Sequence, residues 1–240
     1  MDVLLSRELL RRIVALVFIC AGLAILPLRG AGTASALVAL GVAIHAFVPR
    51  AARPAQARVY DRIPSVHGPD ILGYLLTGFF FALPFWARMG EEYLWVDFGL
   101  LVHPSALLTW PLALISISIL WFSAHYAAFW MLVEADGLQI NRLEGYRTIP
   151  FTDIARVSPF RRGLPKWIRR LTPALVAAGK FGPAGAILLA RDTVGITLTL
   201  RDGSQIPIAS EAFEKPMRSL LKALGKNGIA ITPDNPDKGG

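Results

Sequence analysis

The sequence predicts an α-helical integral membrane domain of four transmembrane helices, followed by a small antiparallel β domain that a C-terminal helix closes. The first observation behind this prediction is composition: 54% of the 240 residues are hydrophobic and only 18% are charged, whereas an ordinary soluble domain is about a quarter charged. The second is a change of pattern after residue 133, from long apolar runs to an alternation of apolar and polar residues that is typical of strands. We therefore expect a membrane domain over residues 1–133, a β domain over 134–232 and a disordered tail over 233–240.

Four stretches of the first domain approach the ~20 apolar residues needed to cross the hydrocarbon core of a bilayer. None of them contains Asp, Glu, Lys or Arg. The stretches are residues 13–28, 33–49, 71–87 and 106–133. The first is short, and it could be extended toward the N-terminus only past Arg11 and Arg12.

The distribution of basic residues predicts the orientation of these helices, because cytoplasmic loops are enriched in Lys and Arg. Seven arginines lie in the N-terminal tail and the second loop, namely Arg7, Arg11, Arg12, Arg50, Arg53, Arg58 and Arg62. The first and third loops hold only Arg29 and Arg88. We therefore expect both termini in the cytoplasm of a bacterium, with the chain in the inner membrane. Asp70 and Asp97 flank the apolar runs, and we interpret them as solvated residues at the membrane interface.

The second domain is predicted as a series of short strands. Residues 136–142, 146–151, 154–160 and 194–200 alternate in polarity, and Asp202-Gly203 is a typical hairpin turn before a returning strand at Ile206–Ile208. Leucines then recur at helical spacing up to Leu224, and Gly225 is suited to end that helix. Pro216 predicts that the regular helix starts next to it, or that its first turn is kinked.

Two sequence motifs of this domain resemble those of a known protein family. The motifs are EADGLQINRLEGYRTIPFTDIARV at residues 134–157 and GITLTLRDGSQIPI at residues 195–208. They resemble the bacterial pleckstrin-homology-like (PH-like) domains that are attached to membrane helices, over about residues 130–232. The resemblance implies a PH-like barrel or sandwich, and lipid or protein recognition without catalysis. The chain departs from the family in a long insertion at residues 161–190.

This insertion begins with a polybasic segment that we consider the best candidate binding site. It surrounds one tryptophan with five basic residues: Arg161, Arg162, Lys166, Trp167, Arg169 and Arg170. Basic residues close to an anionic leaflet contribute about 1 kcal/mol each, and tryptophan favours the headgroup boundary. The alternatives are contact with an acidic protein partner, or a solvated loop without a specific role.

His45 and His125 are the only residues with metal-coordinating chemistry inside the predicted spans, apart from the single cysteine, Cys20. Two imidazoles at similar depth could hold a metal or a haem, but hydrogen bonding between helices is the more ordinary role. We expect no cofactor, no metal and no catalytic residue, because the motifs of nucleotide, zinc and hydrolase sites are absent from the sequence. A nucleic-acid partner is not expected either, since no aromatic platform accompanies the basic residues.

These observations predict a membrane adaptor or scaffold protein. Its PH-like domain would bind anionic lipid headgroups of the inner leaflet, or a protein partner or second copy, at the cytoplasmic face. The alternative is a membrane redox or enzyme subunit that holds a cofactor through His45 and His125.

Overall fold

A computed structural model describes most of the chain. The described residues are 7–50, 52–94, 102–163, 170, 173, 176–177, 193–209, 213 and 217–231. The chain divides into two compact units, Met1–Leu132 with Ile140–Arg147, and Val133–Gln139 with Thr148–Gly240. The predicted tail at 233–240 lies outside the described residues.

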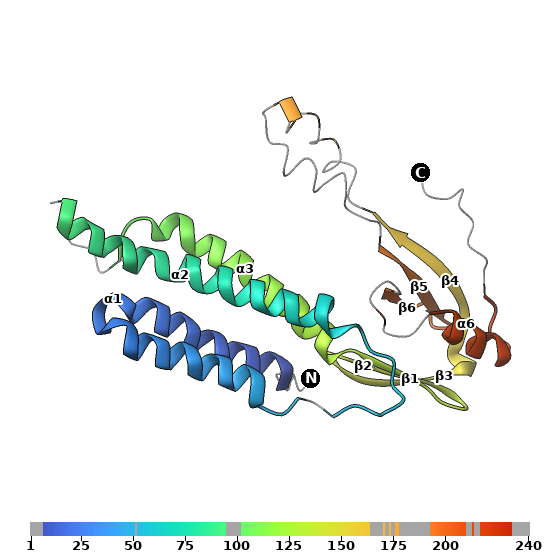
Figure 1. The fold of residues 1–240 in the computed structure, drawn as a ribbon. Helices are drawn as coiled ribbons and strands as arrows, with labels where there is room; N and C mark the ends of the chain where they lie inside the picture. Colours follow the sequence, from blue (N-terminus) through green and yellow to red (C-terminus); the bar gives the residue numbers. More distant parts are fainter. Residues whose placement is uncertain are drawn as a thin grey trace. The chain divides into compact units, whose positions relative to one another are not determined.

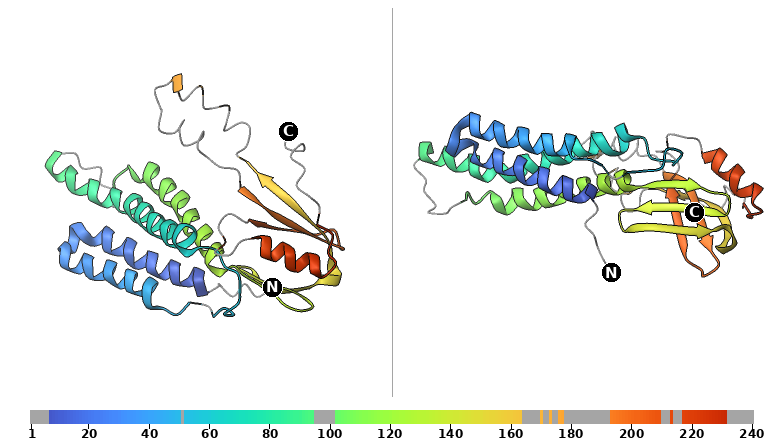
Figure 2. Two further views of the ribbon diagram at one scale, coloured as in Figure 1. Left: turned by 45° about the vertical axis from the view of Figure 1, so that its right-hand side comes forward. Right: turned by 90° about the horizontal axis from the view of Figure 1, so that it is seen from below.

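The first helix, α1, spans Arg7–Phe47 and is a helical hairpin. Its helical geometry is interrupted at Gly30, where φ is 76° and ψ is 173°. A positive φ of this kind is easily adopted only by glycine. The chain reverses here, so that α1 has two arms, residues 7–29 and 31–47, which run side by side (Figures 1 and 2).

Small residues bring the two arms of α1 into close contact. A Cβ atom added to Gly22 would lie 2.8 Å from the carbonyl oxygen of Ala34, and one added to Gly41 would lie 2.8 Å from that of Ala15. Helices in membranes commonly associate through such small residues, which allow their backbones to approach. The predicted helix at 13–28 lies in the first arm, and the one at 33–49 extends two residues beyond the end of the second arm at Phe47.

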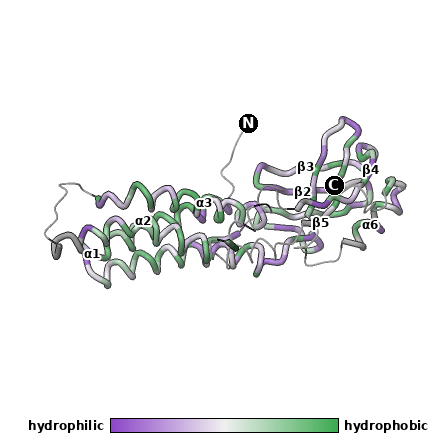
Figure 3. The backbone as a smooth tube through the Cα atoms, turned by 90° about the horizontal axis from the view of Figure 1, so that it is seen from above, coloured by the Kyte–Doolittle hydropathy of each residue, from purple (hydrophilic) through white to green (hydrophobic). Residues whose placement is uncertain are grey.

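Two further long helices complete the helical unit. A short π-helix, η1 (Ile63–His67), leads into α2 (Gly68–Leu94), and α3 spans Ala106–Ala128. Within the described part of the chain, three helices are long and apolar enough to cross a membrane: α1, the helical stretch Ile63–Arg88, and α3. Figure 3 shows hydrophobic residues along all three.

The last predicted span, 106–133, is too long at its C-terminal end. The helix α3 ends at Ala128, and Phe129 has extended backbone angles (φ −71°, ψ 129°). Strand β1 follows at once, from Trp130 to Val133. The first strand therefore begins ahead of the predicted domain start at residue 134.

The rest of the described chain forms two three-stranded sheets and a helix. Strands β1, β2 (Gly137–Arg142) and β3 (Gly145–Pro150) make one sheet in that order, and β4 (Ile154–Arg162), β5 (Thr193–Leu200) and β6 (Gln205–Ala209) make the other. A 3-10 turn, η2 (Phe151–Asp153), joins β3 to β4, and helix α6 spans Met217–Lys226. Pro216, at which the sequence predicts either the start or a kink of this helix, lies outside the described residues.

In the second sheet, Ile196, Leu198 and Leu200 are buried on one face of β5, as the alternation predicts, whereas Val194 at its start is 39% exposed. Strand β5 pairs antiparallel with β4 and with β6, with Leu198 opposite Val157 and Ile206. Leu198 is fully buried, whereas Thr197 is only partly so. Helix α6 lies beside this sheet (Figure 2) and buries Leu220 and Leu224 completely.

Candidate functional site

Charged side chains are buried together at one end of the helical unit. At this end the first arm of α1 begins, the second arm ends, α2 begins and α3 ends. We call the following seven residues the charge network: Glu8, Arg11, Arg12, His45, Asp70, Tyr74 and Ser123. Its four charged residues are each at most 3% exposed.

Arg12 and Asp70 form the centre of the network. The Nε and Nη2 atoms of Arg12 each donate to one carboxylate oxygen of Asp70, both at 2.8 Å. This two-pronged geometry is the strongest arrangement of an arginine and a carboxylate. Arg12 Nη2 also donates to Ser123 Oγ at 3.3 Å, and Ser123 Oγ donates to the carbonyl oxygen of Val66 at 3.1 Å. The pair therefore connects α1, α2, α3 and η1.

Glu8 joins the second arginine to this centre. Its Oε2 atom accepts from Arg12 Nη1 at 2.9 Å and from Arg11 Nη2 at 2.7 Å. The spacing explains why the three side chains meet, since residues three and four apart lie on one face of a helix. Arg11 Nη1 then donates to the carbonyl oxygen of His45 at 2.8 Å, which ties the first arm of α1 to the end of the second.

His45 completes the network from the second arm. Its Nδ1 atom lies 3.0 Å from the hydroxyl of Tyr74, and its Nε2 atom lies 3.4 Å from Asp70 Oδ2. Which ring nitrogen carries the proton depends on the tautomer. In the neutral tautomer with Nε2 protonated, the imidazole donates to Asp70 and accepts from Tyr74, so both contacts are satisfied.

The formal charges of the network balance when His45 is neutral, because two arginines face two carboxylates. Charged groups are costly within a membrane, where they pair with one another and face the interior of the bundle. Removing one partner of a buried pair typically costs about 3–5 kcal/mol, since the remaining charge is left without compensation. The network therefore stabilises the contact between the ends of the two arms of α1, the start of α2 and the end of α3.

The segment that leads into this end is itself tied to the end of α3. Arg58 and Met131 exchange backbone hydrogen bonds of 2.7 and 2.9 Å. The Tyr60 ring packs against Tyr126 and Phe129, with ring centroids 5.0 and 4.8 Å apart. Burial lowers the pKa of the Arg58 guanidinium.

The first hairpin of strands is attached at the same place. Asn141 of β2 donates from Nδ2 to the carbonyl oxygen of Ala128 at 2.7 Å, which satisfies one of the free carbonyls at the end of α3. His125 Nδ1 lies 3.7 Å from Glu144 Oε1, near the surface. Residues 140–147 accordingly belong to the same compact unit as the helices.

The structure corrects the sequence interpretation of three charged residues. Asp70 was expected to be solvated, but it is 2% exposed and bonded to Arg12. Arg11 and Arg12 were assigned to a cytoplasmic tail, but they lie inside α1 and are 3% and 1% exposed. The sequence offered one signal for this, since unpaired charges of opposite sign border the first and third apolar runs.

The two histidines have different partners. His45 contacts Asp70 and Tyr74, whereas His125 contacts Glu144 and lies edge-on to Tyr126 with ring centroids 6.4 Å apart. Within the described ranges, no three His, Cys, Asp or Glu side chains are grouped so that they could hold a metal ion.

Three of the six residues of the polybasic segment lie outside the described residues. Lys166, Trp167 and Arg169 are among the residues that the structure does not describe. Arg161 and Arg162 form the end of β4, where Arg161 is exposed, and Arg170 is exposed as well.

Comparisons with models of known protein families, with curated proteins and with solved structures find no match to this chain.

Proposed function

We propose that the chain is a four-crossing adaptor protein of the bacterial inner membrane, with both termini in the cytoplasm. On this proposal its PH-like domain recognises anionic lipid headgroups or a protein partner at the cytoplasmic face. The observation that carries the proposal is the direct attachment of the first strands to the helices. Through Arg58–Met131 and Asn141–Ala128 the start of the strands is bonded to the end of the helices, so a recognition domain would begin directly where the helices end.

Four crossings follow if each arm of α1 spans the bilayer. At 1.5 Å per residue the arms measure about 34 Å and about 25 Å, close to the ~30 Å of a hydrocarbon core. Helices α2 and α3 supply the other two crossings. The two short connections, at Gly30 and after α2, then lie on one side, and the charge network lies on the other.

The arginine count supports a cytoplasmic position for the charge network even when the buried Arg11 and Arg12 are left out of it. Arg11 and Arg12 are neutralised by Glu8 and Asp70 and no longer contribute to it. The network side retains five basic residues, Arg7, Arg50, Arg53, Arg58 and Arg62, against Arg29 and Arg88 on the other side. The positive-inside rule therefore still favours the same orientation.

Labelling of single cysteines tests this topology. In a Cys20→Ala background, an impermeant thiol reagent added outside intact cells should modify Glu92→Cys but neither Asp61→Cys nor Gly239→Cys. Modification of Asp61→Cys from outside would contradict the orientation.

The PH-like assignment draws support from two antiparallel sheets and a C-terminal amphipathic helix. Binding to lipid draws support from the polybasic segment, which leaves β4 at Arg161 and Arg162. Four arginines near an anionic leaflet correspond to about 4 kcal/mol before screening by salt.

Energy transfer in nanodiscs tests lipid binding in the full-length protein. A donor dye on Gly163→Cys, in the Cys20→Ala background, is combined with acceptor-labelled headgroups. We expect more transfer in discs with phosphatidylglycerol than in discs of phosphatidylcholine alone, and less as salt rises, since exposed charges are screened over ~8 Å at physiological ionic strength.

A matched pair of variants separates a specific segment from general charge. The first removes four arginines of the insertion: Arg161→Gln, Arg162→Gln, Arg169→Gln and Arg170→Gln. The control removes four exposed charges elsewhere: Arg147→Gln, Arg201→Gln, Lys222→Gln and Lys226→Gln. Only the first should abolish the difference between the two kinds of disc. If it leaves the difference intact, lipid binding by this segment is wrong and a protein partner becomes the remaining ligand of the adaptor.

A further inference from the structure

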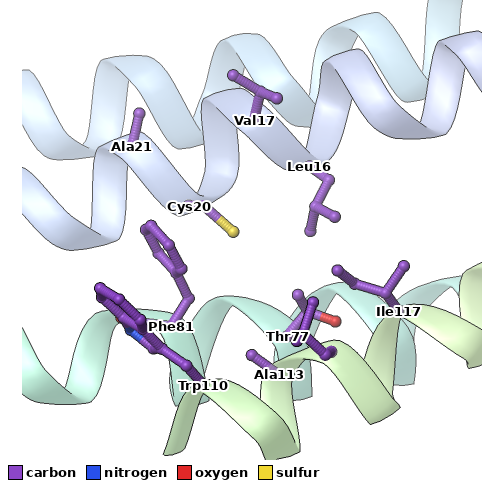
Figure 4. Close-up of a pocket in the computed structure, with 10 residues that line it drawn as sticks. Leu16, Val17, Cys20, Ala21, Thr77, Phe81, Trp110, Ala113 and Ile117 are labelled. Atoms are coloured by element: carbon purple, nitrogen blue, oxygen red, sulfur yellow. The ribbon is translucent and has the colours of Figure 1, made fainter. Parts of the chain in front are cut away.

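An apolar pocket opens in the middle of the helical unit. It has a volume of about 520 Å³ and lies between the first arm of α1, α2 and α3 (Figure 4). The α1 side is formed within Leu16–Ala21, the α2 side by Thr77 and Phe81, and the α3 side within Trp110–Ile117. The volume falls in the ~300–1,000 Å³ range of small-ligand sites.

The lining and its surroundings define the chemistry of an occupant. The lining is almost entirely apolar, and its polar groups are the Cys20 thiol, the Trp110 indole N–H and the Thr77 hydroxyl. The indole N–H donates to the carbonyl oxygen of Phe81 at 3.3 Å, and the Thr77 hydroxyl is buried and has no hydrogen-bond partner in the described structure. Val17 and Leu114 line the pocket and are also 58% and 69% exposed, so the pocket opens onto the outer face of the bundle. In a membrane this face meets lipid hydrocarbon. If the pocket were empty, the side chains that line it would lose their dispersion contacts on that side, so an apolar occupant is favoured.

The dimensions match one leaflet. From Trp110 to Ile117 the α3 side extends about 10 Å, and one leaflet provides ~15 Å of hydrocarbon. Arg88 lies seven residues after Phe81, so it continues the pocket-facing row of α2 about 10 Å further along, directly after the apolar stretch 71–87. Arg88 is exposed at this end. A positive charge here lies where the phosphate of a lipid would be if its chain entered the pocket.

We propose that this pocket is a phospholipid site, with one acyl chain between α1, α2 and α3 and the phosphate at Arg88. The proposal requires that the helices cross a membrane, but it does not depend on the adaptor role or on the PH-like domain. It makes the lipid a bound component of the bundle, since a chain enclosed on three sides exchanges more slowly than one at a flat helix face.

Native mass spectrometry of the full-length protein tests this. Protein is reconstituted in nanodiscs of phosphatidylglycerol and phosphatidylcholine, transferred to mild detergent and washed. We expect the wild-type protein to retain one phospholipid per chain. A wild-type protein that retains none overturns the proposal.

Two neighbouring substitutions test the position of the site. Leu114→Trp places an indole at the pocket opening and should abolish the retained lipid. Ile115→Trp is the control, because Ile115 is similarly exposed (66%) but does not line the pocket. Because both positions face outward, neither change disturbs helix packing, and size-exclusion chromatography checks that both variants stay folded. Equal retention in the two variants, or equal loss, contradicts a site at this pocket.

Arg88→Gln tests the headgroup contact. One basic residue near the headgroups contributes about 1 kcal/mol, so we expect the ratio of lipid-bound to lipid-free protein to fall about fivefold. Unchanged retention in Arg88→Gln overturns the assignment of the phosphate to this residue.

Discussion

Asp70→Asn is the most direct test of the charge network. The substitution keeps the shape of the side chain and removes its charge, so that two arginines face only Glu8 in a buried site. Of the two bonds of 2.8 Å from Arg12 to the Asp70 carboxylate, the asparagine can accept only one, because its second terminal atom is a donor. Because Arg12 and Asp70 are 1% and 2% exposed, water cannot replace the lost partner. We expect a loss of about 3–5 kcal/mol in the free energy of unfolding.

Thermal unfolding of the full-length protein in detergent measures this loss. At ~2–4 °C per kcal/mol for a chain of this size, the midpoint should fall by about 6–20 °C. Asp61→Asn is the control, since Asp61 is exposed and only bonds the backbone nitrogen of Ile63 at the surface. Its midpoint should stay near that of the wild-type protein.

A double substitution distinguishes the loss of compensation from a general loss of packing. Arg12→Met with Asp70→Leu removes both charges and leaves Glu8 paired with Arg11 at 2.7 Å. Replacement of a complete buried pair by apolar residues is often neutral or stabilising. We therefore expect the double variant to be more stable than Asp70→Asn. If Asp70→Asn resembles Asp61→Asn, or if the double variant is the least stable of the three, the account of the network is wrong.

Two further predictions concern packing in the two units, and the thermal midpoint of the full-length protein checks both. Leu198→Ala should destabilise the second sheet by about 2–5 kcal/mol because Leu198 is fully buried, whereas Thr197→Ala should have little effect; equal effects would contradict the register of β5. Gly41→Ala should separate the arms of α1 at a cost of about 1–3 kcal/mol, since its Cβ would lie 2.8 Å from the Ala15 carbonyl oxygen. A Cβ atom added at Gly32 would have no neighbouring atom within 4 Å, so Gly32→Ala should be neutral or stabilising. If Gly32→Ala lowers the midpoint and Gly41→Ala does not, the account of the contact between the two arms is wrong.

The local pattern of apolar and polar residues was sufficient to predict strand β5. The alternation over 194–200 predicted β5, and Ile196, Leu198 and Leu200 form its buried face. The end of α3 was not predictable in this way, because the residues after Ala128 are as apolar as those before it. What ends the helix is the extended conformation of Phe129 and the bond from Asn141, and Asn141 is a residue of a later strand.

The charge network could not be derived from local pattern for a related reason. Arg12 and Asp70 are 58 residues apart in sequence, and each by itself is typical of an interfacial residue next to an apolar run. Only their meeting in the folded bundle removes them from water. A residue-by-residue application of the positive-inside rule therefore assigns Arg11 and Arg12 to the wrong environment while it still gives the same orientation.

The position of the network has a consequence for how the helices meet the bilayer. Charges that pair between helices do not need to reach water, so the outward faces of the same helices can stay apolar. Large apolar side chains are indeed exposed on all three helices, among them Val17 at 58%, Leu75 at 61% and Leu107 at 81%. The network thus links the two arms of α1, α2 and α3 at the end from which the strands begin, and it leaves the outer faces of these helices apolar. Strand β1 begins two residues beyond the end of α3, so the charge network and the start of this strand lie at the same end of the helical unit.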